Sequence, residues 1–553
     1  MKILFLMDSP EYLRFFDSAI EELAARGHHV SLAVGWSREK KPVGLEGLRG
    51  HVANVEAIGV VPHAQGLWAD ISHWLRGTMD FVRYLHPRFA SAPALRDRMK
   101  RKVLPSAYNW LDSIPRLSAP AVRRIERMLM AGERAIPLSR PIVDFLREQA
   151  PDVLLVSPLV AAASPQVDWI KAARALGIRT GACIASWDNL TNKGLLRVEP
   201  DRVIVWNEAQ KQEAQEYHYI PADKVVVTGA QLFDRWFTRR PTRDRAAFCA
   251  RVGLPDDRPF LLFTGSSVFI SRSNIEVPFV RRWIETVRTS GDATLREMNI
   301  LVRPHPYNYH AWVEDPLSDL SRVTVFPRQA YNPIDEANRA DFFDSLYHCS
   351  AVIGVNTSAM IEAAILGKPV FSMLSEEFSG TQEGTVHFHY LLPENGGFLR
   401  IASGLPEHVR QLSERMADVE GARAETARFV SSFLRPGGLD RPATPLFVNA
   451  IEQLGAAPAP KPAPAPAWSA ALRPLLLAAA SVQIAARAAP KKHRIPGRRA
   501  LKTFRGRSAK TAHRAWKEFN KLLRVSAERI RRRARLTGKQ WQKTVVKPLR
   551  TRR

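Results

Sequence analysis

Apolar and polar positions alternate along the first half of the chain in blocks that predict repeated strand–helix units. Residues 2–7 form a short apolar run, and residues 30–34 form the next one. Between them, apolar side chains recur at helical spacing: Leu13, Phe16, Ile20, Leu23 and Ala24. The pattern returns at 153–156 and continues to 225–227. Such a succession predicts a parallel sheet covered by helices.

A second α/β unit begins after Thr228-Gly229-Ala230, which we interpret as the crossing between two domains. Short apolar runs again predict strands, at 259–263, 300–302, 323–326, 351–354 and 370–373. Helical patterns are predicted near 277–290, 341–348, 358–366, 405–418 and 421–434. We therefore predict an α/β protein with two Rossmann-like parallel-sheet domains that face a cleft, at 1–230 and 231–455. Residues 67–150 are predicted to be a helical insertion in the first.

Composition excludes several classes of protein. With 553 residues, 45% of them hydrophobic and 24% charged, the chain is typical of a globular protein with more than one core. Its three cysteines form no CxxC pair, which indicates neither a disulfide framework nor a structural zinc site. No apolar run is long enough to span a membrane, and the apolar run that opens the chain is too short for a signal peptide.

The basic charge is concentrated in a C-terminal tail. Residues 491–553 contain 24 lysines and arginines against two glutamates, a net charge of +22 out of +27 for the whole chain. Residues 456–490 are an Ala/Pro segment and an Ala-rich segment, which predict an extended spacer and an interfacial stretch. Basic residues interleaved with apolar ones predict that 468–553 binds an anionic membrane surface. Nucleic-acid binding and a solvated, disordered tail are the alternatives.

The strand predicted at 351–354 ends in small polar residues that open a helix. Asn356, Thr357 and Ser358 place hydroxyl, amide and free backbone N–H groups there, a pattern that suits a diphosphate. Glu362 lies one turn further along and is expected to accept hydrogen bonds from ribose hydroxyls. The structural alternative is a capping box between these residues and Glu362.

Two further strand exits in the second unit carry candidate ligand-binding residues. Arg303 offers a fork of donors, and His305 can exchange a proton, within a loop that two prolines stiffen. The alternative is a rigid turn with a surface arginine. Gly265, Ser266 and Ser267 follow another strand and are expected to offer backbone amides to phosphates.

In the first unit, the loop after the strand predicted at 178–184 collects several functional groups. Asp188 is the candidate general base and Lys193 a countercharge, with Trp187 and Asn189 beside them on the acceptor side. An Asx-turn is the alternative for Asp188 and Asn189. A further acceptor-side pair follows the first strand: Asp8 and Ser9.

Four segments together resemble a known superfamily. KILFLMD at the start, VVVTGAQLFDRW at the crossing, the VRPHP loop and GVNTSAMIEAAILGKPVFSM resemble GT-B-fold glycosyltransferases. The resemblance is nearest to bacterial surface-polysaccharide transferases and CDP-glycerol glycerophosphotransferase-like proteins. It covers residues 1–455, with 67–150 unmatched.

The resemblance implies a nucleotide-diphosphate donor held by the second domain. Thr357 and Ser358 would meet its phosphates, Glu362 its ribose, and Arg303 or His305 the charge of the leaving group. It also implies no bound metal and no cofactor. The epimerases of this fold carry a Gly-Gly pair and a second acid where this chain has Ala359-Met360 and Ala363, which counts against epimerisation.

We therefore predict a metal-independent glycosyltransferase that moves a sugar from a nucleotide-sugar donor to a cell-envelope glycan or its lipid carrier. The expected location is cytoplasmic, peripheral at the inner face of the plasma membrane. A CDP-glycerol-type glycerophosphotransferase and a non-catalytic scaffold that acts through its basic tail are the alternatives.

Overall fold

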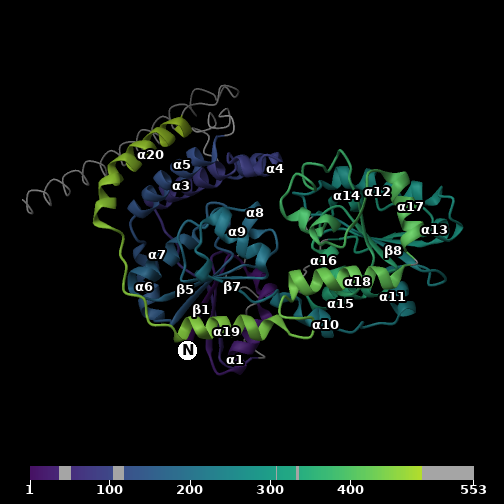
Figure 1. Cartoon of the computed structure of the whole chain (residues 1–553), viewed down its shortest axis with the longest axis horizontal. Coiled ribbons are helices and arrows are strands. Elements are labelled where there is room, and N and C mark those ends of the chain that lie inside the picture. Colours follow the sequence, from purple (N-terminus) through teal and green to yellow (C-terminus); the bar gives the residue numbers. More distant parts are fainter. Residues whose placement is uncertain are drawn as a thin grey trace, which may run out of the picture.

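The computed structural model describes residues 1–36, 52–103, 117–306, 308–329, 331, 335–416 and 418–488. Within them the chain forms two α/β lobes joined side by side (Figure 1). The basic tail at 491–553 lies outside the described residues.

The first lobe is built on a seven-stranded parallel sheet in the order β3-β2-β1-β4-β5-β6-β7. The chain adds strands first to one side of β1 and then, from β4 onward, to the other side. The point where this order reverses therefore lies between β1 and β4, near the centre of the sheet. The strands are β1 (Lys2–Met7), β2 (His29–Val34), β3 (Val55–Val60), β4 (Val153–Ser157), β5 (Arg179–Cys183), β6 (Arg202–Val205) and β7 (Val225–Val227). Helices connecting them include α1 (Asp17–Ala25), α6 (Arg140–Gln149), α7 (Gln166–Leu176) and α9 (Glu208–His218).

The second lobe repeats the plan with six parallel strands in the order β10-β9-β8-β11-β12-β13. They are β8 (Phe260–Thr264), β9 (Asn299–Arg303), β10 (Val323–Val325), β11 (Ala351–Gly354), β12 (Val370–Met373) and β13 (Arg400–Ala402). The helices are α10 (Asp234–Thr238), α11 (Arg245–Val252), α12 (Ser273–Arg288), α13 (Ala293–Glu297), α14 (His310–Glu314), α15 (Glu336–His348), α16 (Ala359–Ile365), α17 (Leu405–Arg415) and α18 (Val419–Phe429). The prediction of two Rossmann-like parallel-sheet domains is confirmed.

The chain returns to the first lobe after α18, and this corrects the predicted boundary at 455. Helix α19 (Ala443–Ala456) packs beneath the first sheet against α1 (Figure 1). Phe447, Ile451 and Leu454 belong to the same buried cluster as the β1 side chains, and the Phe447 ring centroid lies 5.9 Å from that of Phe16. We predicted no helix at these positions, and apolar spacing along a sequence does not indicate which sheet a helix covers.

The predicted insertion is helical, as α3 (Leu67–Arg83), α4 (Pro93–Val103) and α5 (Ala119–Ala135). Its end lies earlier than predicted, because α6 already leads into β4 and packs beside α7. Buried charges join it to the first lobe: the Arg76 guanidinium donates to Glu133 at 3.0 Å and to Asp168 at 3.0 Å.

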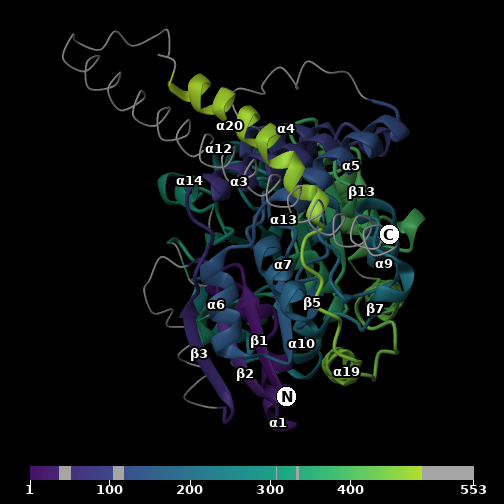
Figure 2. The same cartoon turned by 90° about the vertical axis from the view of Figure 1, so that its left-hand side faces the viewer.

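The Ala/Pro segment does not project into solvent as a free spacer. Its Ala463 N–H donates to the Arg174 carbonyl at 2.9 Å, and the Arg179 side chain donates to the Ala457 carbonyl at 2.7 Å. Helix α20 (Arg473–Ala488) then crosses α3 and α5 (Figure 2), with Leu477 buried against Ile71. Among the helices of the described segments, none combines the length and apolarity that crossing a bilayer requires.

Candidate functional site

A cavity of about 280 Å³ lies between the two lobes, where strands of both sheets end. Loops after β5, β8, β9 and β11 contribute to its wall, as does the segment that follows β1. The carboxyl ends of parallel strands are where ligands bind in open α/β sheets. Five arginines share this wall: Arg14, Arg235, Arg239, Arg303 and Arg339. Two carboxyl groups, those of Asp17 and Glu362, lie among them.

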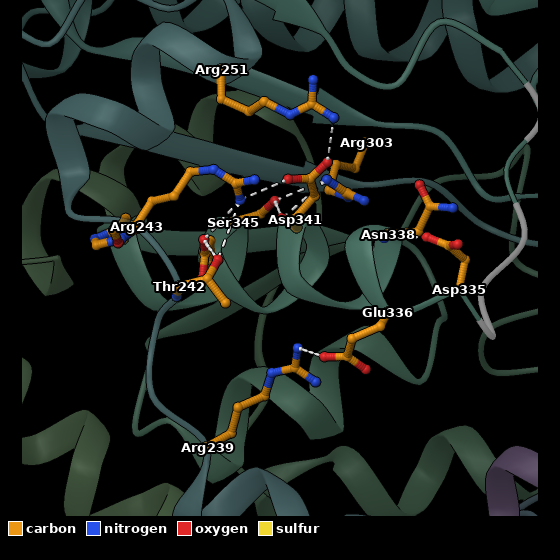
Figure 3. Close-up of polar contacts among 12 residues, drawn as sticks. Arg239, Thr242, Arg243, Arg251, Arg303, Asp335, Glu336, Asn338, Asp341 and Ser345 are labelled. Carbon is orange, nitrogen blue, oxygen red and sulfur yellow. Dashed lines mark hydrogen bonds and ion pairs between the residues drawn. The ribbon is translucent and has the colours of Figure 1, made fainter. Parts of the chain in front are cut away.

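Arg303 is held in place by helix α15 (Figure 3). Its guanidinium donates to the Asp341 carbonyl at 3.2 Å and to the Ser345 hydroxyl at 3.0 Å. The Asp341 carboxylate is instead bound by Arg243 and Arg251, each at 3.1 Å. Arg303 hydrogen-bonds to neutral groups and forms no ion pair with a carboxylate of the described residues, and its buried Nε has no hydrogen-bond partner among them.

The other arginines differ in how far they are neutralised. Arg235 pairs with Asp17 at 3.2 Å and with Glu21 at 2.6 Å, and Arg239 pairs with Glu336 at 2.5 Å. Arg14 has no carboxylate within ion-pair distance in the described part of the chain and lies 4.7 Å from the Phe15 ring centroid. Arg14 and Arg303, one from each lobe, are therefore the cations best placed to bind an anion.

His305 and Glu362 face this charge from the second lobe. Burial, together with the Arg14 charge, lowers the pKa of His305 to about 4, so the imidazole is neutral at pH 7. Burial raises the pKa of Glu362 to about 8 against the opposing effect of Arg14. Glu362 is therefore mostly protonated at neutral pH, and its carboxyl group can donate as well as accept a hydrogen bond.

The start of α16 lies on the wall beside these residues. Ser358 is exposed, and its hydroxyl forms no capping bond to the helix, so the capping box considered as an alternative is absent. The Thr357 hydroxyl accepts the Ala359 N–H at 3.4 Å. Gly265 is also on the wall and is required there: a Cβ would lie 2.9 Å from the His305 backbone nitrogen.

Three predicted donor-side residues support loops and do not line the cavity. The Ser266 backbone N–H donates to Glu276 at 2.8 Å, and Ser267 accepts the Ile270 N–H at 2.9 Å through its carbonyl. Asn356 is buried and donates to the Thr381 carbonyl at 2.7 Å.

On the first lobe, Trp187 lines the cavity, whereas Asp188, Asn189 and Lys193 are not part of its wall. The Asn189 side chain is buried, donates to the Asp188 carboxylate at 3.2 Å and accepts the Ala185 N–H at 3.3 Å, which are local contacts but not the Asx-turn considered for this loop. Burial opposes ionisation of Asp188, but the Lys193 and His387 charges prevail and lower its pKa to about 2. Such a carboxylate accepts protons poorly at neutral pH, which argues against Asp188 as the general base.

Asp8 and Ser9 also lie off the cavity wall, at the end of β1. The Ser9 carbonyl accepts the Tyr12 N–H at 3.1 Å and starts a 3₁₀ turn. Burial raises the pKa of Asp8, although Lys193 and Lys102 oppose the shift. Lys193 in turn reaches the Tyr12 hydroxyl at 3.5 Å, so Asp8, Lys193 and Asp188 form one charged cluster beside the cavity.

Sequence reasoning missed the arginines that come from outside the strand exits. Arg14 lies in a stretch interpreted only through its apolar neighbours, although the turn after the first strand is a common ligand-binding position. Arg235 and Arg239 follow the domain crossing, in α10 and directly after it, and they reach the cavity wall from there.

Two Rossmann-like lobes around one cationic cavity, with a last helix returning to the first lobe, define a protein of the GT-B type of fold. Solved structures similar to the chain include UDP-GlcNAc 2-epimerase from Neisseria meningitidis bound to UDP-GlcNAc (14% identity, 82% of this chain and 100% of that chain, TM-score 0.48). A glycosyltransferase from Rickettsia africae (10%, 82% and 97%, TM-score 0.46) and CalG4, the calicheamicin glycosyltransferase (14%, 83% and 99%, TM-score 0.42), are also similar. At these identities the likeness concerns the fold. No family model matches the chain, and the search of curated proteins found no significant match.

Proposed function

We propose that the protein is a glycosyltransferase that uses a nucleotide-diphosphate sugar as its donor. The observation that carries this proposal is the cavity at the carboxyl ends of two facing parallel sheets, with five arginines on its wall. A diphosphate is the ligand that such a concentration of forked cations suits best. Cavities at this edge of a doubly wound sheet are the usual place for nucleotides.

The donor is placed with its diphosphate between Arg14 and Arg303, and with the exposed Ser358 hydroxyl as a further donor of a hydrogen bond. As the bond between sugar and diphosphate breaks, negative charge accumulates on the leaving oxygen, and these fixed cations stabilise it. Neutral Glu362 is placed at the ribose. The arginines supply the countercharge in this scheme, so the proposal includes no resident metal or cofactor.

The acceptor is placed against the first lobe, where Asp8 replaces Asp188 as our candidate for the general base. Its raised pKa matches proton transfer near neutral pH better than the value of about 2 at Asp188. In this scheme the role of Lys193 is to neutralise the negative charge of the Asp188 carboxylate. Within this scheme the acceptor is a cell-envelope glycan, free or carried on a lipid.

We further propose that the enzyme works at the cytoplasmic face of the membrane, held there by its basic tail. The sequence of 491–553 supports this with its net charge of +22. Helix α20, which precedes this stretch, packs on the helical insertion. Flotation of the full chain with phosphatidylglycerol vesicles tests this, and equal binding to neutral phosphatidylcholine vesicles at any salt concentration would contradict it.

Thermal unfolding with a panel of nucleoside diphosphates and CDP-glycerol tests the transferase proposal. A ligand present at a hundredfold excess over its Kd stabilises the folded state by about 2.7 kcal/mol. We expect at least one nucleoside diphosphate to raise the Tm of the protein, and the Arg14→Gln/Arg303→Gln variant to lose that shift. If none of them moves the Tm, or if the shift survives in the variant, this cavity is not a donor site.

A further inference from the structure

A second cavity, of about 520 Å³, lies between the helical insertion and the second lobe. Helix α4 forms one side, and residues 268–272 after β8 form the other, together with Ile275. None of the residues predicted as catalytic or donor-binding lines it, and nothing in the proposed transfer step uses it.

Four cations line this second cavity: Arg98, Arg101, Lys102 and Arg272. Across the described segments, none of these four lies within ion-pair distance of a carboxylate. The carboxylate on the wall, that of Glu377, is already bound by Arg282. Burial, with the Arg98 and Lys193 charges, lowers the pKa of Lys102 against the opposing effect of Asp8.

The opposite side of the second cavity carries several apolar side chains beside Arg272. Val268 is 54% exposed and Ile275 is 38% exposed, so both present apolar surface on this side. Phe269 lies between the two classes of residue, and the Arg98 guanidinium stands 3.9 Å from its ring centroid. The cavity therefore offers cations and apolar surface within one space.

The charged cluster of the first lobe links this cavity to the donor cavity. Lys102 and Lys193 both act on the Asp8 carboxyl group. Lys193 reaches Tyr12, whose ring centroid is 5.4 Å from that of Phe15, and Phe15 lines the donor cavity. Lys102, which lines the second cavity, is thus close enough to Asp8 for its charge to act on that carboxyl group.

We propose that the second cavity binds the phosphate or diphosphate of an amphiphilic acceptor, with the cations of α4 on the phosphate and Val268, Phe269 and Ile275 on the adjoining apolar chain. This inference rests on the proposed function, since it gives the acceptor of that transferase its chemical class. Forked and ammonium cations bind phosphate through charge-assisted hydrogen bonds. The apolar wall selects a phosphate esterified to a hydrocarbon over a free or nucleic-acid phosphate.

Isothermal titration of the full chain with farnesyl diphosphate tests the proposal, in the presence of saturating nucleoside diphosphate so that the donor cavity is occupied. The Arg98→Gln/Arg101→Gln/Lys102→Gln variant is expected to bind farnesyl diphosphate on the order of thirtyfold more weakly, because three charged contacts are lost. The matched control carries the same change of charge on exposed arginines of α17 and α18, as Arg410→Gln/Arg423→Gln/Arg428→Gln, and is expected to stay within about twofold of the parent.

Two further ligands identify what the cavity recognises. Farnesol lacks the phosphates and inorganic diphosphate lacks the chain, and each is expected to bind at least about tenfold more weakly than farnesyl diphosphate. If inorganic diphosphate bound as tightly as farnesyl diphosphate, the proposal of an amphiphilic ligand would be overturned. Unchanged affinity of the α4 variant for farnesyl diphosphate would overturn it as well. If the α4 variant no longer bound phosphatidylglycerol vesicles but still bound farnesyl diphosphate, α4 would be a membrane contact, and the proposal of an acceptor site would also be overturned.

The same measurements separate this inference from the proposed function. The α4 variant is expected to bind nucleoside diphosphate within about twofold of the parent, which also shows that it is folded. If the parent chain binds no nucleoside diphosphate, the transferase proposal alone is defeated. Retained nucleotide binding with unaltered farnesyl diphosphate affinity in the α4 variant defeats the acceptor-site inference alone.

Discussion

At the scale of single residues, the donor cavity is governed by which charges are already paired. Arg14 and Arg303 reach it without a carboxylate partner, whereas Arg235 shares the wall but is held by Asp17 and Glu21. By charge alone the three arginines would be equally able to bind an anion, but their contacts show that Arg235 is already paired.

Substitution of Arg14 therefore separates a ligand-binding cation from a structural one. We expect Arg14→Gln to weaken nucleoside diphosphate binding by about tenfold or more, since a hydrogen bond to a charged group contributes about 1.5–3 kcal/mol. Arg235→Gln is the matched control, and we expect a smaller loss because its charge is already neutralised. Calorimetric titration of both variants is the measurement, and equal losses would contradict the distinction.

Glu362 gives nucleotide binding a pH dependence with a defined sign. Its pKa is raised to about 8, so between pH 7 and pH 8.5 the carboxyl group ionises and places a negative charge beside the diphosphate. We expect the affinity for the nucleoside diphosphate that raises the Tm to fall about threefold over this range, the effect of a partly screened like charge. Glu362→Gln stays neutral and should bind with little pH dependence.

The same shift has a consequence for stability. Because the folded pKa of Glu362 exceeds the ordinary value of 4.5, its contribution to stability is fully present below about pH 4.5 and is lost as the pH rises through 8. The Tm of the parent should therefore fall more between pH 5 and pH 8.5 than the Tm of Glu362→Gln does. A pH-independent difference between the two would contradict the shift.

At the scale of elements, helix α3 fixes the loop that follows β5. Arg83 donates to the Gly194 carbonyl at 2.9 Å, and the Tyr84 hydroxyl donates to the Lys193 carbonyl at 2.7 Å. Asp80 accepts the Leu195 N–H at 2.8 Å and forms a fully buried ion pair with Arg197. The insertion thus positions Lys193 and its neighbours, although it contributes no strand.

Removing one charge of the buried Asp80–Arg197 pair should destabilise the protein strongly, whereas removing both charges should destabilise it much less. Asp80→Asn leaves the Arg197 charge buried without its anion, and we expect a loss of about 3–5 kcal/mol in the free energy of unfolding. Asp80→Asn/Arg197→Met removes both charges and should recover most of that loss. Urea unfolding measures both variants, and additive losses in the double variant would show that the ion pair is not the cause.

Elements were also the level at which sequence reasoning succeeded most. The apolar runs located β8, β9 and β11, and since parallel strands end at one edge, they correctly brought Arg303, Ser358 and Glu362 to one cavity. Short peripheral strands such as β13 (Arg400–Ala402) carry too little apolar signal to be found. The low pKa that argues against Asp188 as the base could not be predicted from the sequence, because it depends on the Lys193 charge beside Asp188 and residue type alone does not give it.

At the scale of the whole molecule, the two lobes are joined by a crossing that needs glycine. Gly229 has φ +90, and a Cβ there would lie 2.7 Å from the Cβ of Ala443 and 2.9 Å from the Leu434 carbonyl oxygen. The outgoing chain and the returning segment therefore touch at this residue, and their contact fixes how α19 meets the first lobe.

Alanine at Gly229 should destabilise more than backbone strain alone explains. Gly253 is the matched control, since it has φ +78 but a Cβ there would meet nothing within 4 Å. We expect Gly253→Ala to cost about 1 kcal/mol for the left-handed backbone, and Gly229→Ala to cost about 1–3 kcal/mol more for the collision. Equal free energies of unfolding would mean that the crossing has room to adjust.

The C-terminal region contains helix α20, which packs on the helical insertion, and the basic stretch at 491–553, for which we propose membrane binding. Leu477 and Ala480 are buried with Ile71 and Trp74 of α3, so truncation after Ala456 uncovers apolar surface on the insertion. Burying one leucine side chain contributes about 1.5–3 kcal/mol, and we expect that truncation to lower the Tm by several degrees. Truncation after Ala488 should abolish flotation with phosphatidylglycerol vesicles. Retained flotation in this shorter chain would move membrane binding from the tail to α20 and the insertion, because those would be the elements left to carry it.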